Sequence, residues 1–333
     1  MADAFSLFPH LWWVPLLALA LDLLLADSLP FPHPVQGIGR LLDWLEPFAR
    51  RQAHSSPGSI APEAVSARLR WGGFFSVLLV TGVCVLVVVA GAALPSILGL
   101  AVLVYFSYAG LALGGLVREG RKCLALLRTN DVEASLRAVS MLVSRDLSTA
   151  NMQTIRMSLA ESVSENFNDA FVAPFFWLLL AGPAGLWIYK AASTMDSCWG
   201  YKTPRHRDFG RACARLDDFL AYVPARLSAL LLWGAAQFGQ AGACWPGWPT
   251  VGKEAGAMES PNAGWPMATA AWLLGGEMGG ALWYHGQLVH KPRRGPAGAE
   301  WGDEKLEALF VLVLRAGLAG GGIMWLAALF AYS

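Results

Sequence analysis

The sequence WGGFFSVLLVTGVCVLVVVAGAALPSILGLAVLVYFSYAGLALGGL, residues 71–116, contains no charged side chain and decides the fold class. A helix needs about 20 apolar residues to cross the hydrocarbon core of a bilayer. The runs at 71–91 and 94–116 both reach this length, and a very short turn separates them. The stretch therefore predicts a helical hairpin of two membrane spans.

Further apolar runs flank this hairpin on both sides. Residues 11–26 form a short run that carries Asp22, which we interpret as a retained first span, and residues 306–332 form a long run. The runs at 227–245 and 266–284 are diluted by Gly, Gln and Glu, so they either span, dip into the membrane or pack on protein. We expect an all-α, polytopic integral membrane protein with about 4–6 spans.

The composition supports this class and argues against others. Of the 333 residues, 55% are hydrophobic and 15% are charged, whereas soluble domains carry about 25% charged residues. The mean hydropathy is +0.44, and the 15 Trp are typical of membrane interfaces. A net charge of +1 gives no bulk electrostatic reason to bind nucleic acid. The five cysteines lack ligand or paired spacing, so neither a zinc site nor a disulfide framework is indicated.

Lys and Arg predict the orientation, since cytoplasmic loops carry an excess of both. Segment 28–70 carries five arginines, and segment 117–226 carries 14 of the 25 Lys and Arg residues. Crossing the hairpin returns the chain to the same side of the membrane. Both segments are therefore predicted to be cytoplasmic, with the N-terminus outside, and we expect a single membrane-embedded domain over residues 1–333.

The apolar run at 171–192 tests this topology. The sequence Gly182-Pro183-Ala184-Gly185 interrupts it, and a crossing here would place the basic residues that follow on the outside, against the charge rule. Irregular backbone at membrane depth is tolerated only against protein or a wet cavity. We therefore expect a re-entrant or protein-buried helical hairpin that helps to wall a site.

Loops and helix starts can be predicted elsewhere from local signals. Residues 52–66 and 244–263 are rich in Pro, Gly and Ser or Asn and are predicted loops. Residues 131–166 contain good helix formers and few breakers, and Asp131 and Asn151 are predicted helix starts.

A stack of carboxylates is the most specific local pattern. Glu161, Glu165 and Asp169 recur every fourth residue, so on a helix they line one face and repel one another. With no Lys or Arg interleaved, the stack is predicted to attract a magnesium ion, an amine or an arginine from elsewhere. Magnesium usually takes one or two carboxylates plus substrate phosphates. The alternative is a solvated acidic face, although such faces usually mix signs.

A dense group of cations follows between residues 202 and 211. It consists of Lys202, Arg205, Arg207 and Arg211. Guanidinium and ammonium groups suit phosphate or carboxylate oxygens. A loop that merely fixes topology is the alternative interpretation. Acids are interspersed at Asp196, Asp208, Asp217 and Asp218, and they favour a built site, since a topology loop needs none.

Three smaller groups are further candidates. An ionisable residue within a span, such as Asp22, indicates function by default, and Asp27 and His33 follow it. Ser144-Arg145-Asp146 precedes the acidic stack, and Asn262 precedes a Gly that could open a helix and offer backbone N–H groups to an anion. The structural alternatives are a helix end that reaches water, a loop ion pair and a simple cap. No P-loop and no GxSxG motif is present.

Taken together and in this order, these segments resemble one family, the adenosylcobinamide-phosphate synthases of cobalamin biosynthesis (the CbiB/CobD proteins). The matching motifs include Leu21-Asp22, Pro32-His33-Pro34-Val35, Val143-Ser144-Arg145-Asp146, Glu161-Ser-Val-Ser-Glu165-Asn166, Gly200-Tyr201-Lys202, Ala214-Arg215-Leu216-Asp217-Asp218 and Ser260-Pro-Asn-Ala-Gly-Trp-Pro-Met267. The resemblance covers about residues 20 to 290. Departures from the family pattern are Ala26 and Ser28 around Asp27, Ala170 and Ser193.

The resemblance implies an enzyme of the bacterial inner membrane whose active face is cytoplasmic. Members of the family use ATP to join the propionate carboxyl of adenosylcobyric acid to the amine of (R)-1-aminopropan-2-ol phosphate. ATP and magnesium are thus the implied cofactors, the cobalt corrinoid is a substrate, and the implied partners are membrane lipid and other late cobalamin-assembly enzymes.

The resemblance also implies roles for the residues that match. The implied catalytic acids are Glu161, Glu165, Asp169, Asp196 and Asp217, of which the first three are the candidate magnesium ligands. The implied substrate and phosphate contacts are Asp22, Asp27, His33, Ser144, Arg145, Asp146, Asn166, Tyr201, Lys202, Arg207, Asp208, Arg215 and Asn262.

Two rival functions and one topological conflict stay open. A phosphoalcohol transferase acting on lipid also places acids at a membrane face, but residues 214–218 do not reproduce the spacing of its signature. A non-catalytic membrane sensor or regulator of related fold is the other alternative. If residues 227–245 cross the membrane, the motif at 260–267 lies outside, away from the other motifs, unless it is drawn into the membrane.

Overall fold

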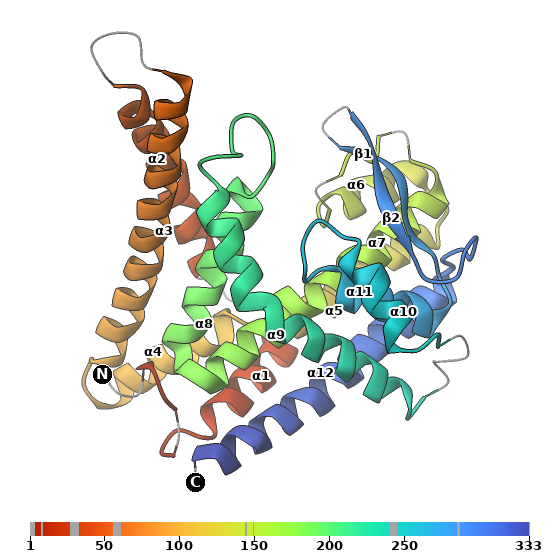
Figure 1. Cartoon of the computed structure of the whole chain (residues 1–333). Coiled ribbons are helices and arrows are strands. Elements are labelled where there is room, and N and C mark those ends of the chain that lie inside the picture. Colours follow the sequence, from red (N-terminus) through yellow and green to blue (C-terminus); the bar gives the residue numbers. More distant parts are fainter. Residues whose placement is uncertain are drawn as a thin grey trace. The chain divides into compact units, whose positions relative to one another are not determined.

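The computed structural model describes residues 4–7, 9–26, 33–55, 61–143, 145–148, 150–239, 245–284 and 287–332 (Figure 1). Its helices are α1 (Val14–Leu25), α2 (Pro34–His54), α3 (Pro62–Ala92), α4 (Ser96–Ala109), α5 (Leu113–Leu127), α6 (Val132–Ser140), α7 (Met152–Asn166), α8 (Ala173–Trp199), α9 (Arg211–Ala236), α10 (Trp248–Gly256), α11 (Gly264–Leu274) and α12 (Asp303–Tyr332). A π-helical segment, η2 (Phe167–Val172), joins α7 to α8, and strands β1 (Met278–Tyr284) and β2 (Gln287–Arg294) form one antiparallel hairpin. The predicted all-α class is confirmed.

Five helical stretches of the described chain are long and apolar enough to cross a membrane, in agreement with the predicted number of spans. They are Pro62–Ala92, Ile97–Leu127, Met152–Trp199, Arg211–Ala236 and Asp303–Tyr332. Helix α1 is apolar but has only 12 residues. At 1.5 Å per residue it is about 18 Å long, less than a hydrocarbon core of about 30 Å. The prediction of a full first span at 11–26 is therefore corrected to a short helix.

The chain groups into two compact units that each combine distant segments. Unit 1 comprises Met1–Leu111, Pro174–Leu220 and Trp325–Ser333, and unit 2 comprises Ala112–Ala173 and Ala221–Met324. Helices α9 and α12 begin in one unit and end in the other. The single domain over residues 1–333 stays a prediction.

In unit 1, α3 and α4 pack against each other, which confirms the predicted hairpin, and α1 and α2 pack on α4 and α3. The polar tips of aromatic side chains find backbone partners. The Trp187 indole donates to the Phe106 carbonyl oxygen at 2.9 Å, and the Trp325 indole donates to the Trp12 carbonyl oxygen at 2.7 Å. The second bond ties the last turns of α12 to the start of the chain.

The predicted break in the run at 171–192 is confirmed. Within α8, Ala181 and Gly182 leave helical backbone angles, with φ of −137° and +61°. Gly182 is required here, since its φ favours glycine and a Cβ would lie 2.7 Å from the Ala4 carbonyl oxygen. Of the most apolar window of Met152–Trp199, 72% is buried inside the protein, as a protein-packed segment requires.

In unit 2, α7 packs against α5, α6 and α11, and the β-hairpin lies against α7, α10 and α11. Both predicted helix starts are confirmed as N-caps. The Asp131 carboxylate accepts from the Ala134 N–H at 2.9 Å, and the Asn151 side chain accepts from the Thr154 N–H at 2.8 Å. Such caps satisfy N–H groups that have no partner within the helix.

The predicted loops are shorter in the structure, because proline starts helices in both. The prediction for 244–263 is wrong at α10, where Pro249 occupies the first turn after Gly247. The loop at 52–66 is narrowed by α2, which extends to His54, and by α3, which begins at Pro62. Proline is tolerated in a first helical turn, since its missing N–H has no partner there anyway.

The β-hairpin was not predicted from the sequence. Strand β1 begins at Met278, and Gly279 and Gly280 follow with φ values of +93° and +96°, where glycine is favoured. The register shifts between Met278 and Gly280. Glycines at an irregular strand start carry no β-branched signal, so the alternation that marks a strand is lost.

Candidate functional site

Glu161 lies on α7 with 2% of its surface exposed, and donors surround its carboxylate. Oε1 accepts from Arg294 Nη2 at 2.9 Å and from the Gly279 N–H at 2.7 Å. Oε2 accepts from Arg145 Nη2. Arg294, at the end of β2, is itself 1% exposed. A buried ion pair therefore ties the β-hairpin to α7.

This geometry does not fit a magnesium site built from all three carboxylates of the stack. Both oxygens of Glu161 are occupied by protein donors. Within the described ranges, no group of three or more His, Cys, Asp or Glu side chains could hold a metal ion. Of the three partners predicted for the stack, Glu161 takes arginines from elsewhere in the chain.

The other two carboxylates lie in a different environment. Glu165 is half-buried and makes no hydrogen bond or ion pair with any described residue. Asp169, also half-buried, lies in η2 and accepts from Asn168 Nδ2 at 2.7 Å. Asn166 donates back to the Ser162 carbonyl oxygen at 2.9 Å. The wider π-helical turn displaces Asp169 from regular α-helical spacing, and such segments frequently occur at functional sites.

Asn262 precedes α11, which begins at Gly264 as predicted, but its side chain is used within the protein. It is 4% exposed, and its Oδ1 accepts from Arg226 Nη1 at 3.1 Å. The Arg226 guanidinium also lies 3.5 Å from the Tyr222 ring centroid. Asn262 therefore positions an arginine in this structure, and a direct contact with substrate stays a prediction.

A second site lies in unit 1, where a pocket of about 370 Å³ opens beside the start of α9. Its charged lining consists of Arg70, Lys202, Arg207, Arg211, Arg215, Asp208 and Asp218. We call it the cationic pocket, since five cations face two carboxylates. Tyr201 also lines it, so the structure brings five of the predicted contacts together: Tyr201, Lys202, Arg207, Asp208 and Arg215.

Helices α2 and α3 anchor the loop that forms this pocket. Glu46 Oε1 accepts from Arg50 Nε at 2.7 Å and from Arg205 Nε at 2.9 Å. Arg205 thus serves as an anchor here, although the sequence suggested a phosphate contact. Asp208 Oδ1 accepts from Arg70 Nε at 2.9 Å.

Both anchoring carboxylates are held in the charged form. Burial raises the pKa of Glu46, but hydrogen bonds from Arg50 and Arg205 and their charges outweigh it and hold that pKa below its usual range. The hydrogen bond from Arg70 lowers the pKa of Asp208. At neutral pH the loop is therefore fixed by ionised groups.

Replacing Glu46 with glutamine is expected to loosen this loop, because a neutral amide oxygen cannot hold two arginines as a carboxylate does. Since the folded-state pKa of Glu46 is lowered, its contribution to the stability of the loop is fully present above the ordinary carboxyl pKa. It is lost only as the pH falls through the lowered pKa, below the ordinary carboxyl range. Hydrogen exchange of residues 200–210 measures this, with the exposed Glu133→Gln as control. Equal exchange in Glu46→Gln and wild type at neutral pH would contradict the anchoring role.

The remaining predicted residues are placed separately. Asp22 is 1% exposed on α1, and His33 caps α2 by accepting from the Val35 N–H at 3.2 Å. Asp146 is exposed and accepts from the Ser148 N–H at 2.9 Å. Asp196 on α8 and Asp217 on α9 are half-buried in unit 1. Asp27 and Ser144 lie outside the described residues.

Three important partners were missed by sequence reasoning. Arg294 lies beyond the last recognisable motif, and its burial depends on the unpredicted hairpin. Arg70 and Glu46 lie in helices with no motif, and Arg70 was counted only toward topology. An acidic residue four positions before Arg50 was the one signal in the sequence for the Glu46 anchor.

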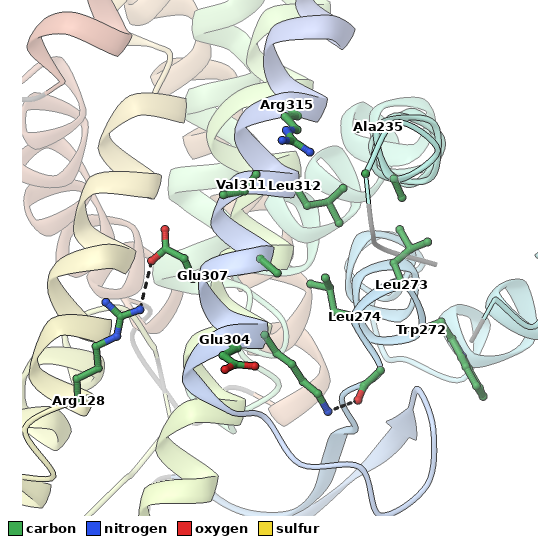
Figure 2. Close-up of a pocket in the computed structure, with 15 residues that line it drawn as sticks. Arg128, Ala235, Trp272, Leu273, Leu274, Glu304, Glu307, Val311, Leu312 and Arg315 are labelled. Carbon is green, nitrogen blue, oxygen red and sulfur yellow. Dashed lines mark hydrogen bonds and ion pairs between the residues drawn. The ribbon is translucent and has the colours of Figure 1, made fainter. Parts of the chain in front are cut away.

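A further pocket, of about 680 Å³, lies in unit 2 beside the first half of α12 and contains none of the predicted site residues (Figure 2). Several of its charges are satisfied within the protein. Glu307 pairs with Arg121 at 2.9 Å and Arg128 at 3.7 Å, and Lys305 Nζ donates to the Gly275 carbonyl oxygen at 2.5 Å. It adds no predicted chemistry to the two sites above.

Comparisons with known proteins cover nearly the whole chain. A family model described as "CobD/Cbib protein" matches residues 15–313. "Cobalamin biosynthesis protein CobD" of Chromobacterium violaceum is 37% identical over 281 residues, 84% of this chain and 85% of that protein. "Cobalamin biosynthesis protein CbiB" of Salmonella arizonae is 33% identical over 325 residues, 91% and 97% of the two chains. No solved structure matches the chain.

Proposed function

Because the chain belongs to the CobD/CbiB family, we propose that it acts in cobalamin biosynthesis as an ATP-dependent amide ligase. It joins adenosylcobyric acid to (R)-1-aminopropan-2-ol phosphate and forms adenosylcobinamide phosphate. We further propose that the reaction takes place at the bacterial inner membrane with a cytoplasmic active face, and the five helices that are long and apolar enough to span support a multi-pass protein. The outside N-terminus predicted from the sequence required a crossing at 11–26, for which α1 is too short. Other late cobalamin-assembly enzymes are the proposed protein partners.

The cationic pocket is the observation that carries this proposal. An amine that bears a phosphate needs concentrated positive charge, and the pocket offers five cations against two carboxylates. Arginine forks and lysine point charges both bind phosphate oxygens well. We assign the substrate phosphate to Lys202 and Arg207, since both lie on the anchored loop and line the pocket.

The reaction needs an activated carboxyl group, because a carboxylate does not react with an amine at neutral pH. In the proposed first step, a propionate oxygen attacks the γ-phosphorus of ATP, and ADP leaves. In the second, the deprotonated amine attacks the acyl carbon, an amide bond forms and phosphate leaves. The amine proton goes to a carboxylate base, and we propose Glu165 for this role because no described protein donor occupies its carboxylate.

A magnesium site fits only with two of the three carboxylates of the stack as ligands. Glu161 is excluded by its arginines, whereas Glu165 and Asp169 provide the one or two carboxylates that magnesium usually takes beside substrate phosphates. When bound, the ion would neutralise charge on the transferring phosphoryl group. Asp196 and Asp217 remain candidate acids in unit 1.

Replacing Arg207 with alanine is expected to raise the KM for aminopropanol phosphate about tenfold or more, because a charge-assisted hydrogen bond is worth about 1.5–3 kcal/mol. The same variant should turn over unphosphorylated aminopropanol nearly as well as wild type, since that amine has no phosphate to lose a contact. The exposed Arg137→Ala serves as control. Equal losses with both amines would contradict the assignment.

Complementation separates the ligase from a regulatory protein of related fold. A strain that lacks this protein and is fed cobyric acid should require the wild-type chain for cobalamin-dependent growth. Growth of the strain without the wild-type chain would contradict the proposed activity.

A further inference from the structure

An apolar groove of about 490 Å³ lies along α3 in unit 1. Its wall includes Phe74, Leu78, Gly82 and Val85 of α3 and Ala212 and Leu216 of α9. Thr81 also lines it, but its hydroxyl donates to the Val77 carbonyl oxygen at 2.7 Å. The surface of the groove is therefore apolar.

The groove and the cationic pocket share two helices. With 3.6 residues per turn, Arg70 lies on the same stripe of α3 as Phe74 and Leu78, and Arg70 lines the cationic pocket. On α9, Arg211 and Arg215 line that pocket, and the residues that follow each of them line the groove. The apolar groove thus leads to a group of cations.

The length of the groove along α3 matches the thickness of one leaflet of a bilayer. Phe74 and Val85 are separated by 11 positions of α3, a helix long and apolar enough to span. At 1.5 Å per residue this is about 17 Å, roughly half of a 30 Å hydrocarbon core. The charged end, at Arg70, precedes the apolar part, as it does where a span leaves the membrane.

Arg211 and Arg215 are left to bind an anion. Neither guanidinium makes a hydrogen bond or ion pair with a residue that the structure describes. They are one turn apart on α9, so the two like charges repel. The substrate phosphate was assigned above to Lys202 and Arg207, on the loop.

We propose that this combined site holds one anionic phospholipid, with its phosphate on Arg211 and Arg215 and an acyl chain in the groove of α3. A free phosphate would use the cations and leave the groove empty, whereas an apolar protein segment would leave the cations unmatched. A phospholipid satisfies both, and clusters of Lys and Arg at the end of a span bind anionic headgroups. The lipid would also support the loop from the membrane side.

Native mass spectrometry of the full-length protein tests this, after release from nanodiscs of equal phosphatidylglycerol and phosphatidylcholine. The wild type should retain phosphatidylglycerol in preference. Arg211→Gln combined with Arg215→Gln should lower that preference about tenfold. Gly82→Phe should reduce retention of both lipids, because a Cβ there meets no atom within 4 Å and the ring can fill the groove without displacing protein. Arg137→Gln, in unit 2, is the matched control.

Equal retention of the two lipids by wild type, or an unchanged preference in the double arginine variant, would overturn the proposal. The proposal would also be overturned if inorganic phosphate protects the two arginines from chemical modification while the protein retains no lipid. The test is separate from that of the ligase: a wild-type protein that forms no amide but retains phosphatidylglycerol as expected counts against the proposed function alone.

Discussion

Replacing Glu165 with alanine is expected to abolish formation of adenosylcobinamide phosphate, while the protein still folds and inserts. The carboxylate makes no hydrogen bond or ion pair with a described residue, so its removal breaks none of the described polar contacts of α7. If Glu165 is the base that takes the amine proton, its loss should slow turnover by about 100- to 10,000-fold. Asp169→Ala should have the same result, through the positioning of the ammonium or of magnesium.

Turnover is measured with purified protein in detergent, as conversion of adenosylcobyric acid separated by chromatography. The amount of folded protein in the membrane fraction is measured in parallel. Glu165→Gln keeps the size and removes the charge, so it should be as inactive as the alanine variant. Glu133→Ala, on the surface of α6, is the control. Near-normal turnover of both Glu165→Ala and Asp169→Ala would remove the acidic face from the mechanism.

Local signals in the sequence predicted the parts of the fold that local physics decides. The hairpin of α3 and α4, the N-caps at Asp131 and Asn151 and the break at Gly182 all depend on residues within a few positions of one another. In each case the residues that impose the backbone or hydrophobic requirement lie within the element that they determine. The length of α1 was misjudged, because an apolar composition does not fix where a helix begins.

Contacts between distant segments could not be predicted in the same way. Glu161 and Arg294 are 133 positions apart. Their pairing depends on the β-hairpin, which the sequence does not reveal because glycines replace the alternating pattern of a strand. The every-fourth spacing of Glu161, Glu165 and Asp169 therefore suggested one site of three like members. The cationic pocket was easier to predict, since most of its lining lies between residues 200 and 218, and Arg70 alone comes from elsewhere.

The second large effect is expected from Glu161, one turn from Glu165, but on stability. Glu161→Ala leaves Arg294 buried without its carboxylate, and breaking a buried ion pair by removing one partner costs about 3–5 kcal/mol. Arg294→Ala should cost a similar amount, because Glu161 would keep, of its partners in the described chain, Arg145 and the Gly279 N–H. The free energy of unfolding is measured by denaturant titration in detergent, followed by near-UV circular dichroism. Glu133→Ala, which breaks an exposed pair with Arg137, should change it by about 1 kcal/mol or less.

A double variant decides whether this loss comes from the ion pair or from packing. Glu161→Gln with Arg294→Met removes both charges of the pair, keeps most of the volume and leaves an amide oxygen that can accept from Arg145. It should therefore lose much less stability than the single variants Glu161→Gln and Arg294→Met lose together. If the double variant is as unstable as the sum of the single ones, the buried charges are not coupled and the link between the β-hairpin and α7 rests on packing. Recovery of both stability and activity would separate two functions along one helix: Glu161 would hold the hairpin in place, and Glu165, which is unchanged in the double variant, would carry the chemistry.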